Sequence, residues 1–410
     1  MVDLLIASQS DLPPAMNDID PDTNCPCESG WLFSQCCGVE NRSAVNANIM
    51  AVIAADGEVT SHELTEQIRS SITSITGNPD LFPARVDFSN NKSWFVKMSP
   101  RWYRESVFLD PGRIKGTFVI EADLAWLQQV SSNITQQPAS FIFHTAFCGS
   151  TLMSQALDAL YQILPLREPE VLGNLLVYQR SDVNKKTKQL WLDCVLRLLS
   201  RRYETDQQVV VKVNDYANPL MLALANADYL KPMLFMYTPL NEFLAGCLKA
   251  NNRREWVAQR YKAIVNVVPH WLNLPENMSI REDSYGKMAA VYWCYNIALY
   301  LEAANRSSSQ VRSLDFNQML ENPYEVVEAV DMLFGLTLRN NISRSEEIQR
   351  LFGMYSKNSQ LTYSPEQRIN DIAVLLKQNQ AELDEAEQLA YQLLGSNYPE
   401  YGLPGRLVDS

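Results

Sequence analysis

Apolar residues recur along the chain in two different patterns, which together predict an α/β protein. Downstream of Phe141, short continuous apolar runs alternate with stretches in which apolar residues return every three or four positions. Runs of the first kind are typical of strands buried on both faces of a sheet, and the second kind is typical of amphipathic helices. Because the two kinds alternate, we expect a parallel sheet flanked by helices. The expected strands are FIFHTAF, QVVVKVN, KPMLFMYT and QVRSLDF, and the expected helices include TLMSQALDALYQI, QLWLDCVLRLLSRRY, NPLMLALANADYL, LNEFLAGCLKAN and NPYEVVEAVDMLFGL.

The segments on either side of this region follow other patterns. A helical pattern begins at about Ala47, and β-branched and aromatic residues from Phe82 to about Ile120 predict short strands or a hairpin. Two polar amphipathic helices are expected after about Asn340. The expected organisation is an acidic flexible arm (1–24), a cysteine-rich module (25–40), a mixed helical and short-strand region (41–137), an α/β domain (138–340) and C-terminal helices (341–410).

Composition and charge limit the partners of this chain. It has 410 residues, of which 46% are hydrophobic and 20% charged, values typical of a globular protein. Its formal charge of −12 argues against nucleic acid or an anionic membrane as a partner. The most apolar stretch, Met288 to Leu301, is too short for the ~20 residues of a membrane helix, and the N-terminus lacks the basic region of a signal peptide. We therefore expect a cytoplasmic protein that holds any anionic ligand in a local site.

Four of the eight cysteines lie within thirteen residues, as Cys25, Cys27, Cys36 and Cys37. Their spacing, C-x-C-x8-C-C, supplies four thiolates, which is the ligand set of a tetrahedral structural zinc site. Unpaired surface thiols are the alternative. The segment from about Asn24 to Gly38 resembles the SEC-C motif through CPCxSG and CCG. This resemblance implies a zinc module that contacts a protein partner and has no catalytic role.

The other cysteines are single and lie in apolar surroundings, at positions 148, 194, 247 and 294. Cys148 belongs to a turn with its own chemistry and is considered below. We expect the remaining three to be small core residues.

The segment FIFHTAFCGSTLMSQAL predicts an anion site between a buried strand and a helix. Free N–H groups and the helix dipole favour an anion at such a helix start. Gly149 allows the backbone to approach closely, and the hydroxyls of Ser150 and Thr151 can donate to phosphate oxygens. In a Walker A loop a glycine would replace His144 and a lysine would replace Ser150, so we do not expect an ordinary ATPase or GTPase. The expected ligand-binding residues are Cys148, Gly149, Ser150, Thr151 and Leu152.

The same segment resembles the 5′-phosphosulfate loop of sulfotransferases, which usually reads RSGSTLL. LREPEVL, VVVKVND, LFMYTPLNEFLAGCL and VRSLDFNQMLENPYEVVEAVDMLFGL also match family segments in the right order, over about residues 138–338. The resemblance implies a parallel sheet of the P-loop sulfotransferase type and a donor, 3′-phosphoadenosine-5′-phosphosulfate. The family clamps the 3′-phosphate with R-x-P-x-D-x-x-x-S. Here Tyr237, Asn241 and Ala245 replace the Arg, Asp and Ser, and only Pro239 remains.

The resemblance also implies catalytic roles. Glu168, in the Glu-Pro segment, would take the proton of a hydroxyl or amine acceptor, and Lys212 would stabilise charge on the leaving group. His144 is a rival base. A buried histidine bonded to backbone, an exposed helix-start carboxylate and a surface lysine are the structural alternatives for these three residues. Lys249, Arg253 and Arg254 could replace the clamp charge, and Lys212, Arg167 and Arg312 could supply other charge.

Two other functions stay open at this point. The chain could be a catalytically inactive adaptor that binds a nucleotide or a protein partner and carries a zinc module. A kinase-like transferase is less favoured, because the sequence has neither a Walker lysine nor an obvious magnesium aspartate.

Overall fold

The computed structural model of the protein describes residues 76, 79–110, 113–114, 117–135, 138–226, 231–274, 280–307, 311–353 and 365–408. The acidic arm, the four clustered cysteines and the helical pattern from Ala47 lie outside the described residues. The predicted SEC-C-like zinc module therefore stays a prediction from the sequence.

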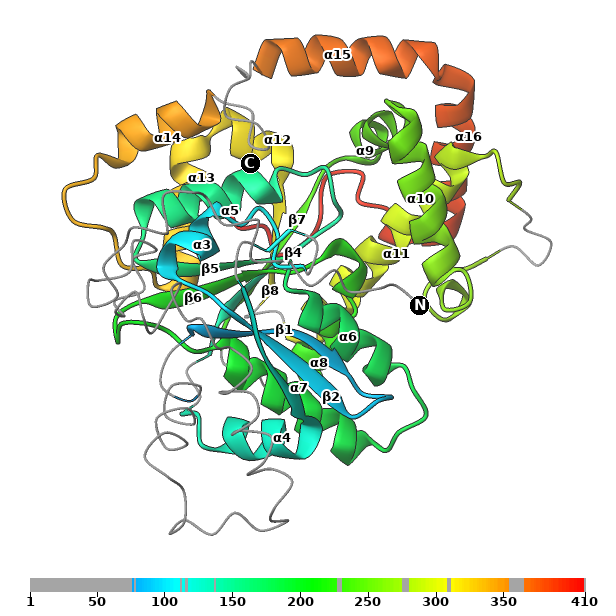
Figure 1. Cartoon of the computed structure of the whole chain (residues 1–410). Coiled ribbons are helices and arrows are strands. Elements are labelled where there is room, and N and C mark those ends of the chain that lie inside the picture. Colours follow the sequence, from blue (N-terminus) through cyan, green and yellow to red (C-terminus); the bar gives the residue numbers. More distant parts are fainter. Residues whose placement is uncertain are drawn as a thin grey trace, which may run out of the picture.

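The centre of the molecule is a five-stranded parallel sheet with the order β5-β6-β4-β7-β8 (Figure 1). This confirms the predicted α/β fold class with a parallel sheet flanked by helices. The chain leaves β4 toward β5 on one side, and it later crosses from β6 past β4 to β7 on the other side. In open α/β sheets, ligands bind at the carboxyl ends of the strands where the order reverses in this way. The strands are β4 (Ser140–His144), β5 (Ile163–Arg167), β6 (Gln208–Lys212), β7 (Met233–Tyr237) and β8 (Val311–Asp315).

Helices cover both faces of this sheet, which explains why its strands are apolar throughout. Ile142 and Leu234 point to one face, whereas Phe141, Phe143 and Phe235 point to the other, as the alternation of side chains along a strand requires. The first face is covered by α5 (Ser150–Leu160), α12 (Phe316–Glu321), α13 (Pro323–Phe334) and α14 (Arg344–Phe352). The second face is covered by α6 (Glu170–Gln179), α7 (Lys185–Leu199), α8 (Leu220–Asn226), α9 (Leu240–Leu248), α10 (Asn251–Ile264), α11 (Tyr285–Arg306) and α16 (Gln380–Leu394).

The long apolar stretch forms the core helix α11, as predicted. Its polar residue, Asn296, is buried, and its amide group donates to the carbonyl oxygen of Tyr292 at 2.8 Å. Among the described residues, no helix is long and apolar enough to cross a membrane.

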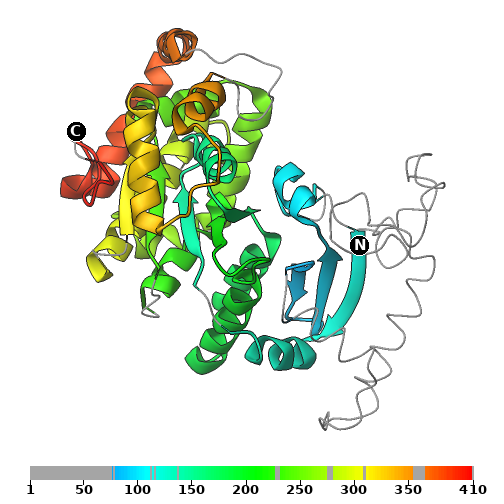
Figure 2. The same cartoon turned by 90° about the vertical axis from the view of Figure 1, so that its left-hand side faces the viewer.

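A second, antiparallel sheet precedes the α/β region and forms a separate layer in Figure 2. It confirms the short strands predicted after Phe82. Phe88, just after the first strand, stacks on Tyr178 of α6 with ring centroids 4.1 Å apart, so this sheet shares a core with the α/β region. Its elements are β1 (Leu81–Asp87), β2 (Lys92–Lys97), α3 (Pro100–Glu105), β3 (Thr117–Asp123) and α4 (Leu124–Ser132).

Two expectations about individual elements were wrong. The helix predicted to run to Ile163 ends at Leu160, and Ile163 begins strand β5. After Asn340 the described residues form three helices rather than two, because Asn379 separates α15 (Pro365–Gln378) from α16. Short 3-10 helices lie at Asp215–Ala217, Val268–His270 and Gly395–Asn397.

Candidate active site

The carboxyl ends of β4, β5 and β6 bring the three predicted catalytic residues together. His144 is the last residue of β4, Lys212 is the last of β6, and Glu168 directly follows β5. In the parallel register Lys212 lies beside Ile142 on one side and Arg167 on the other. Residues far apart in the sequence therefore meet at one edge of the sheet.

Glu168 is the centre of this cluster. Its Oε1 accepts a hydrogen bond from Nζ of Lys212, and the same oxygen lies 3.9 Å from Nε2 of His144. The Lys212 side chain is 2% exposed and that of Glu168 is 17% exposed. Solvent therefore reaches the carboxylate, whereas the ammonium is buried. The ammonium also lies 5.4 Å from the centroid of the Phe108 ring. A backbone bond from the N–H of Glu168 to the carbonyl of Lys212, 2.6 Å long, fixes the two strand ends together.

His144 is buried and held from two directions. Its Nδ1 accepts a hydrogen bond from the N–H of Ala146 at 3.0 Å, so in the neutral ring the proton is on Nε2, the nitrogen nearer Glu168. The side chain of Asn218 donates to the carbonyl oxygen of His144 at 2.9 Å. His144 thus has the backbone hydrogen bond expected of a buried structural histidine. It also lies close to Glu168, as a catalytic histidine would.

The loop between β4 and α5 has an unusual backbone. Ala146, Phe147 and Gly149 have φ values of 68°, 53° and 72° in the left-handed region. Glu168 shares this conformation with a φ of 54°. Left-handed non-glycine residues are strained, and they gather at ligand-binding and catalytic sites. Turns of this kind also expose successive N–H groups to an anion.

The loop amides fit a phosphate or sulfate group. Within the described residues, no protein group accepts a hydrogen bond from the N–H of Gly149, Thr151 or Leu152. The N–H of Ser150 is turned toward the sulfur of Cys148. Three amides at the start of an 11-residue helix therefore stay available to an anion.

Side chains around the loop define which of its groups can reach a ligand. The thiol of Cys148 is fully buried and donates to the carbonyl of Met236 at 3.3 Å, and burial raises its pKa to about 11. Leu152 also packs in the core. Cys148 and Leu152 can thus serve a ligand through their backbone only, whereas the Ser150 and Thr151 hydroxyls have no partner among the described residues.

Gly149 is the position where the loop tolerates no side chain. A Cβ atom built there would lie 2.3 Å from the ring of Phe316 and 2.7 Å from the methyl group of Met319. Both residues come from α12, so this helix packs directly against the loop.

The basic residues proposed as substitutes for the clamp charge differ in position. The guanidinium of Arg253, from α10, lies 4.7 Å from the centroid of the Phe147 ring and donates to the carbonyl of Gly246 at 2.7 Å. Trp256 packs against the other edge of Phe147, with ring centroids 5.0 Å apart. Arg253 is therefore the substitute that reaches the loop.

Of the other basic residues, Arg167, Lys249 and Arg254 have partners away from the loop, and Arg312 lies within β8 beside Leu234 of β7. Arg167 is buried, pairs with Asp158 at 2.7 Å and donates to three backbone carbonyls, so its role is structural. Lys249 pairs with Asp371 at 3.3 Å on the surface. Arg254 lies over the ring of Tyr285 at 5.7 Å.

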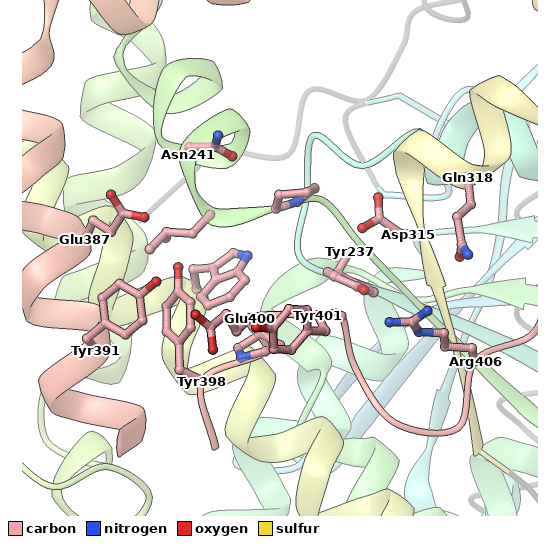
Figure 3. Close-up of a pocket in the computed structure, with 15 residues that line it drawn as sticks. Tyr237, Asn241, Asp315, Gln318, Glu387, Tyr391, Tyr398, Glu400, Tyr401 and Arg406 are labelled. Carbon is pink, nitrogen blue, oxygen red and sulfur yellow. The ribbon is translucent and has the colours of Figure 1, made fainter. Parts of the chain in front are cut away.

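Three of the four residues at the positions of the 3′-phosphate clamp line a cavity of about 440 Å³ at the ends of β7 and β8 (Figure 3). Tyr237, Pro239 and Asn241 all face it. The hydroxyl oxygen of Tyr237 accepts a hydrogen bond from the N–H of Leu403 at 3.2 Å, and burial raises the pKa of this tyrosine to about 12. Tyr237, Pro239 and Asn241 carry no positive charge for a phosphate group, and the arginine of this cavity is Arg406, near the C-terminus. The loop amides, by contrast, fit such a group.

Sequence reasoning missed a polar network just beyond β6. The carboxylate of Asp215 accepts two hydrogen bonds from Arg260, at 2.7 and 3.0 Å, and one from the hydroxyl of Tyr292 at 2.6 Å. Asn218 from the same turn holds His144. Polar residues directly after a buried apolar strand were the signal, because such residues lie at the ligand-binding edge of a parallel sheet.

The described residues contain no group of three or more histidine, cysteine or acidic side chains that could hold a metal ion. Cys194, Cys247 and Cys294 are buried, which confirms their predicted place in the core.

No protein-family model matches the chain, and no curated protein sequence matches it. The solved structures that are similar to it include two sulfotransferases. One is a sulfotransferase from Alicyclobacillus acidocaldarius, with 14% identity over 64% of this chain and 99% of that chain and a TM-score of 0.31. The other is the sulfotransferase domain from the curacin biosynthetic pathway, with 11% identity over 60% and 99% and a TM-score of 0.30.

Proposed function

We propose that this protein is a sulfotransferase-like enzyme that moves a sulfuryl group from 3′-phosphoadenosine-5′-phosphosulfate to a hydroxyl or amine acceptor. One observation carries the proposal. Glu168, Lys212 and His144 meet at the end of the sheet, directly beside a strand-to-helix loop whose amides are available to an anion. The sequence resemblance to sulfotransferases points to Glu168, Lys212 and the loop, and His144 is the rival base.

The site supplies a base and a set of donors for this chemistry. Glu168 takes the proton from the acceptor, and His144 holds a second proton beside it. The donor provides the sulfuryl group: a bond forms from the acceptor oxygen or nitrogen to sulfur, and the bond from sulfur to the 5′-phosphate oxygen breaks. The amides of Gly149 and Thr151 and the ammonium of Lys212 then stabilise the charge that develops on that phosphate.

The positive charge that holds the 3′-phosphate of the donor must come from residues outside the usual clamp. Tyr237 and Asn241 carry no positive charge. Arg253 is the cation that lies against the loop, and we propose that it supplies this charge.

Equilibrium binding of adenosine 3′,5′-bisphosphate tests the proposal. We expect binding that Thr151→Ala weakens about tenfold or more, because the variant removes a hydroxyl donor to a charged phosphate. Thr205→Ala is the matched control, since Thr205 is exposed in the turn before β6. ATP binding without bisphosphate binding would instead indicate a kinase-like transferase.

The second candidate function is an inactive adaptor that binds a nucleotide or a protein partner. It is favoured by the loss of the clamp charges at Tyr237 and Asn241. We propose that the cysteine module then provides a zinc-ordered surface for a protein partner. If neither adenosine 3′,5′-bisphosphate nor ATP binds to the parent chain or to Thr151→Ala, the result would favour the adaptor.

A further inference from the structure

The cavity at the ends of β7 and β8 has a composition that does not suit a nucleotide phosphate. It lies between helix α16, the segment 398–406, the start of α9 and the end of β8. Its walls combine aromatic rings with carboxylates (Figure 3). The aromatic and acidic residues near α16 that line it are Trp293, Tyr391, Tyr398, Tyr401, Glu387 and Glu400.

Aromatic rings form one continuous wall of the cavity. Tyr391 and Tyr398 are stacked with centroids 3.8 Å apart, and Tyr398 lies 6.2 Å from the ring of Trp293. Tyr401 is 82% exposed and Tyr391 is 44% exposed, so two of these rings offer their faces to solvent. Large aromatic surfaces exposed together at a cavity are typical of a ligand site.

The charge at this wall is negative. Glu387 and Glu400 stand beside Tyr391 and Tyr398, whereas Arg406 lies beside Tyr237 and Gly402 on the side of the cavity nearer β8 (Figure 3). In the part of the chain that the structure describes, no lysine or arginine forms an ion pair with Glu387 or Glu400. Two carboxylates without a cationic partner, beside π faces that carry partial negative charge, attract a cation and repel a phosphate.

We propose that this cavity binds an organic cation with a quaternary ammonium or protonated amine head group. The rings of Tyr391, Tyr398 and Tyr401 contact the head group, Trp293 supports them from the core, and Glu387 and Glu400 balance its charge. An aromatic wall of this kind favours alkylated ammonium groups over hydrated metal ions, because the alkyl groups pack against the rings. The proposal goes beyond the transfer reaction and does not depend on it.

Calorimetric titration with choline tests the proposal, with 3,3-dimethylbutan-1-ol as the neutral probe of the same shape. The full chain is expected to bind choline about tenfold more tightly than the neutral alcohol, since only choline gains the cation–π and carboxylate attraction. Equal affinity for the two probes, or no heat from either, would overturn the proposal.

Variants of the residues that line the cavity test whether choline binds there. Glu387→Gln and Tyr391→Leu are each expected to weaken binding about fivefold to tenfold. Glu385→Gln is the matched control on the same helix, because Glu385 pairs with Lys287 instead of lining the cavity. Equal affinities for the two glutamine variants would contradict the assignment. Thr151→Ala is expected to leave choline binding unchanged, which separates this test from that of the transfer reaction.

Discussion

At the scale of single residues, the site depends on a buried charge pair. The Lys212 side chain is 2% exposed, and its ammonium donates to Glu168 at the strand ends. A buried ammonium without a partner is strongly unfavourable. The Glu168 carboxylate therefore offsets the cost of burying the Lys212 ammonium, and the ammonium does the same for the carboxylate. The left-handed backbone of Glu168 adds a second constraint, because its N–H is bonded to the carbonyl of Lys212. Glu168, the proposed base, is thus held in place by the protein itself.

This pairing predicts strong coupling between the two residues. Glu168→Gln leaves the buried ammonium uncompensated and is expected to lower the free energy of unfolding by about 3 kcal/mol. Combining it with Lys212→Met should cost less than the sum of the single changes, by about 1–3 kcal/mol. Urea unfolding of the four proteins measures this cycle.

A surface pair provides the control for that cycle. Lys249→Met removes a pair whose members are about half exposed, and the expected loss is about 0–1 kcal/mol. Additive effects of the Glu168 and Lys212 changes, within about 0.5 kcal/mol, would show that the two groups do not depend on each other.

At the scale of elements, the loop from β4 to α5 depends on close contact with α12. Gly149 has a φ of 72° and lies against Phe316 and Met319. A second glycine, Gly335, has a similar φ of 64° at the end of α13 but has nothing within 4 Å of its missing Cβ. The two positions share the backbone strain and differ in the space around them.

Substituting both glycines separates strain from steric overlap. Gly335→Ala is expected to lower the free energy of unfolding by about 1 kcal/mol, the cost of a left-handed alanine. Gly149→Ala should cost about 2–4 kcal/mol, because α12 must also move. It should also abolish bisphosphate binding, whereas Gly335→Ala should not. Similar losses for the two variants in thermal and urea unfolding would mean that α12 yields easily.

Most elements of the parallel sheet could be predicted from the sequence, and the exception has a physical reason. Strands β4, β6, β7 and β8 are recognisable as continuous apolar runs, whereas β5 contains Pro165 and follows a helix without a break in apolar periodicity. Proline cannot donate to a neighbouring strand, which argues against a central strand. The structure resolves this, because β5 lies at the edge of the sheet and pairs only with β6.

At the scale of the whole molecule, the candidate active site could be predicted from the sequence, whereas the aromatic cavity could not. Glu168 and Lys212 were predicted from the resemblance of LREPEVL and VVVKVND to sulfotransferase segments, and His144 was predicted as a rival base at the end of an apolar strand. Their meeting follows from the parallel sheet, in which strand ends lie at one edge. The cavity joins Tyr237 to Tyr391 and Glu400, which belong to distant parts of the chain. No local pattern indicates that α16 returns to the end of β7. Only the packing of α16 on α11 brings these residues together.

The distribution of cysteines through the whole chain allows a final prediction. Cys148, Cys194, Cys247 and Cys294 are buried, and burial raises the pKa of each thiol, so none should react with a thiol reagent in the folded protein. If Cys25, Cys27, Cys36 and Cys37 hold zinc as we propose, they too are protected. A chelator should therefore release about one zinc per chain and expose four thiols, and denaturant should raise the count to all eight. Rapid reaction of four thiols in freshly prepared reduced protein, with no zinc in the solution afterwards, would show that the module binds no metal.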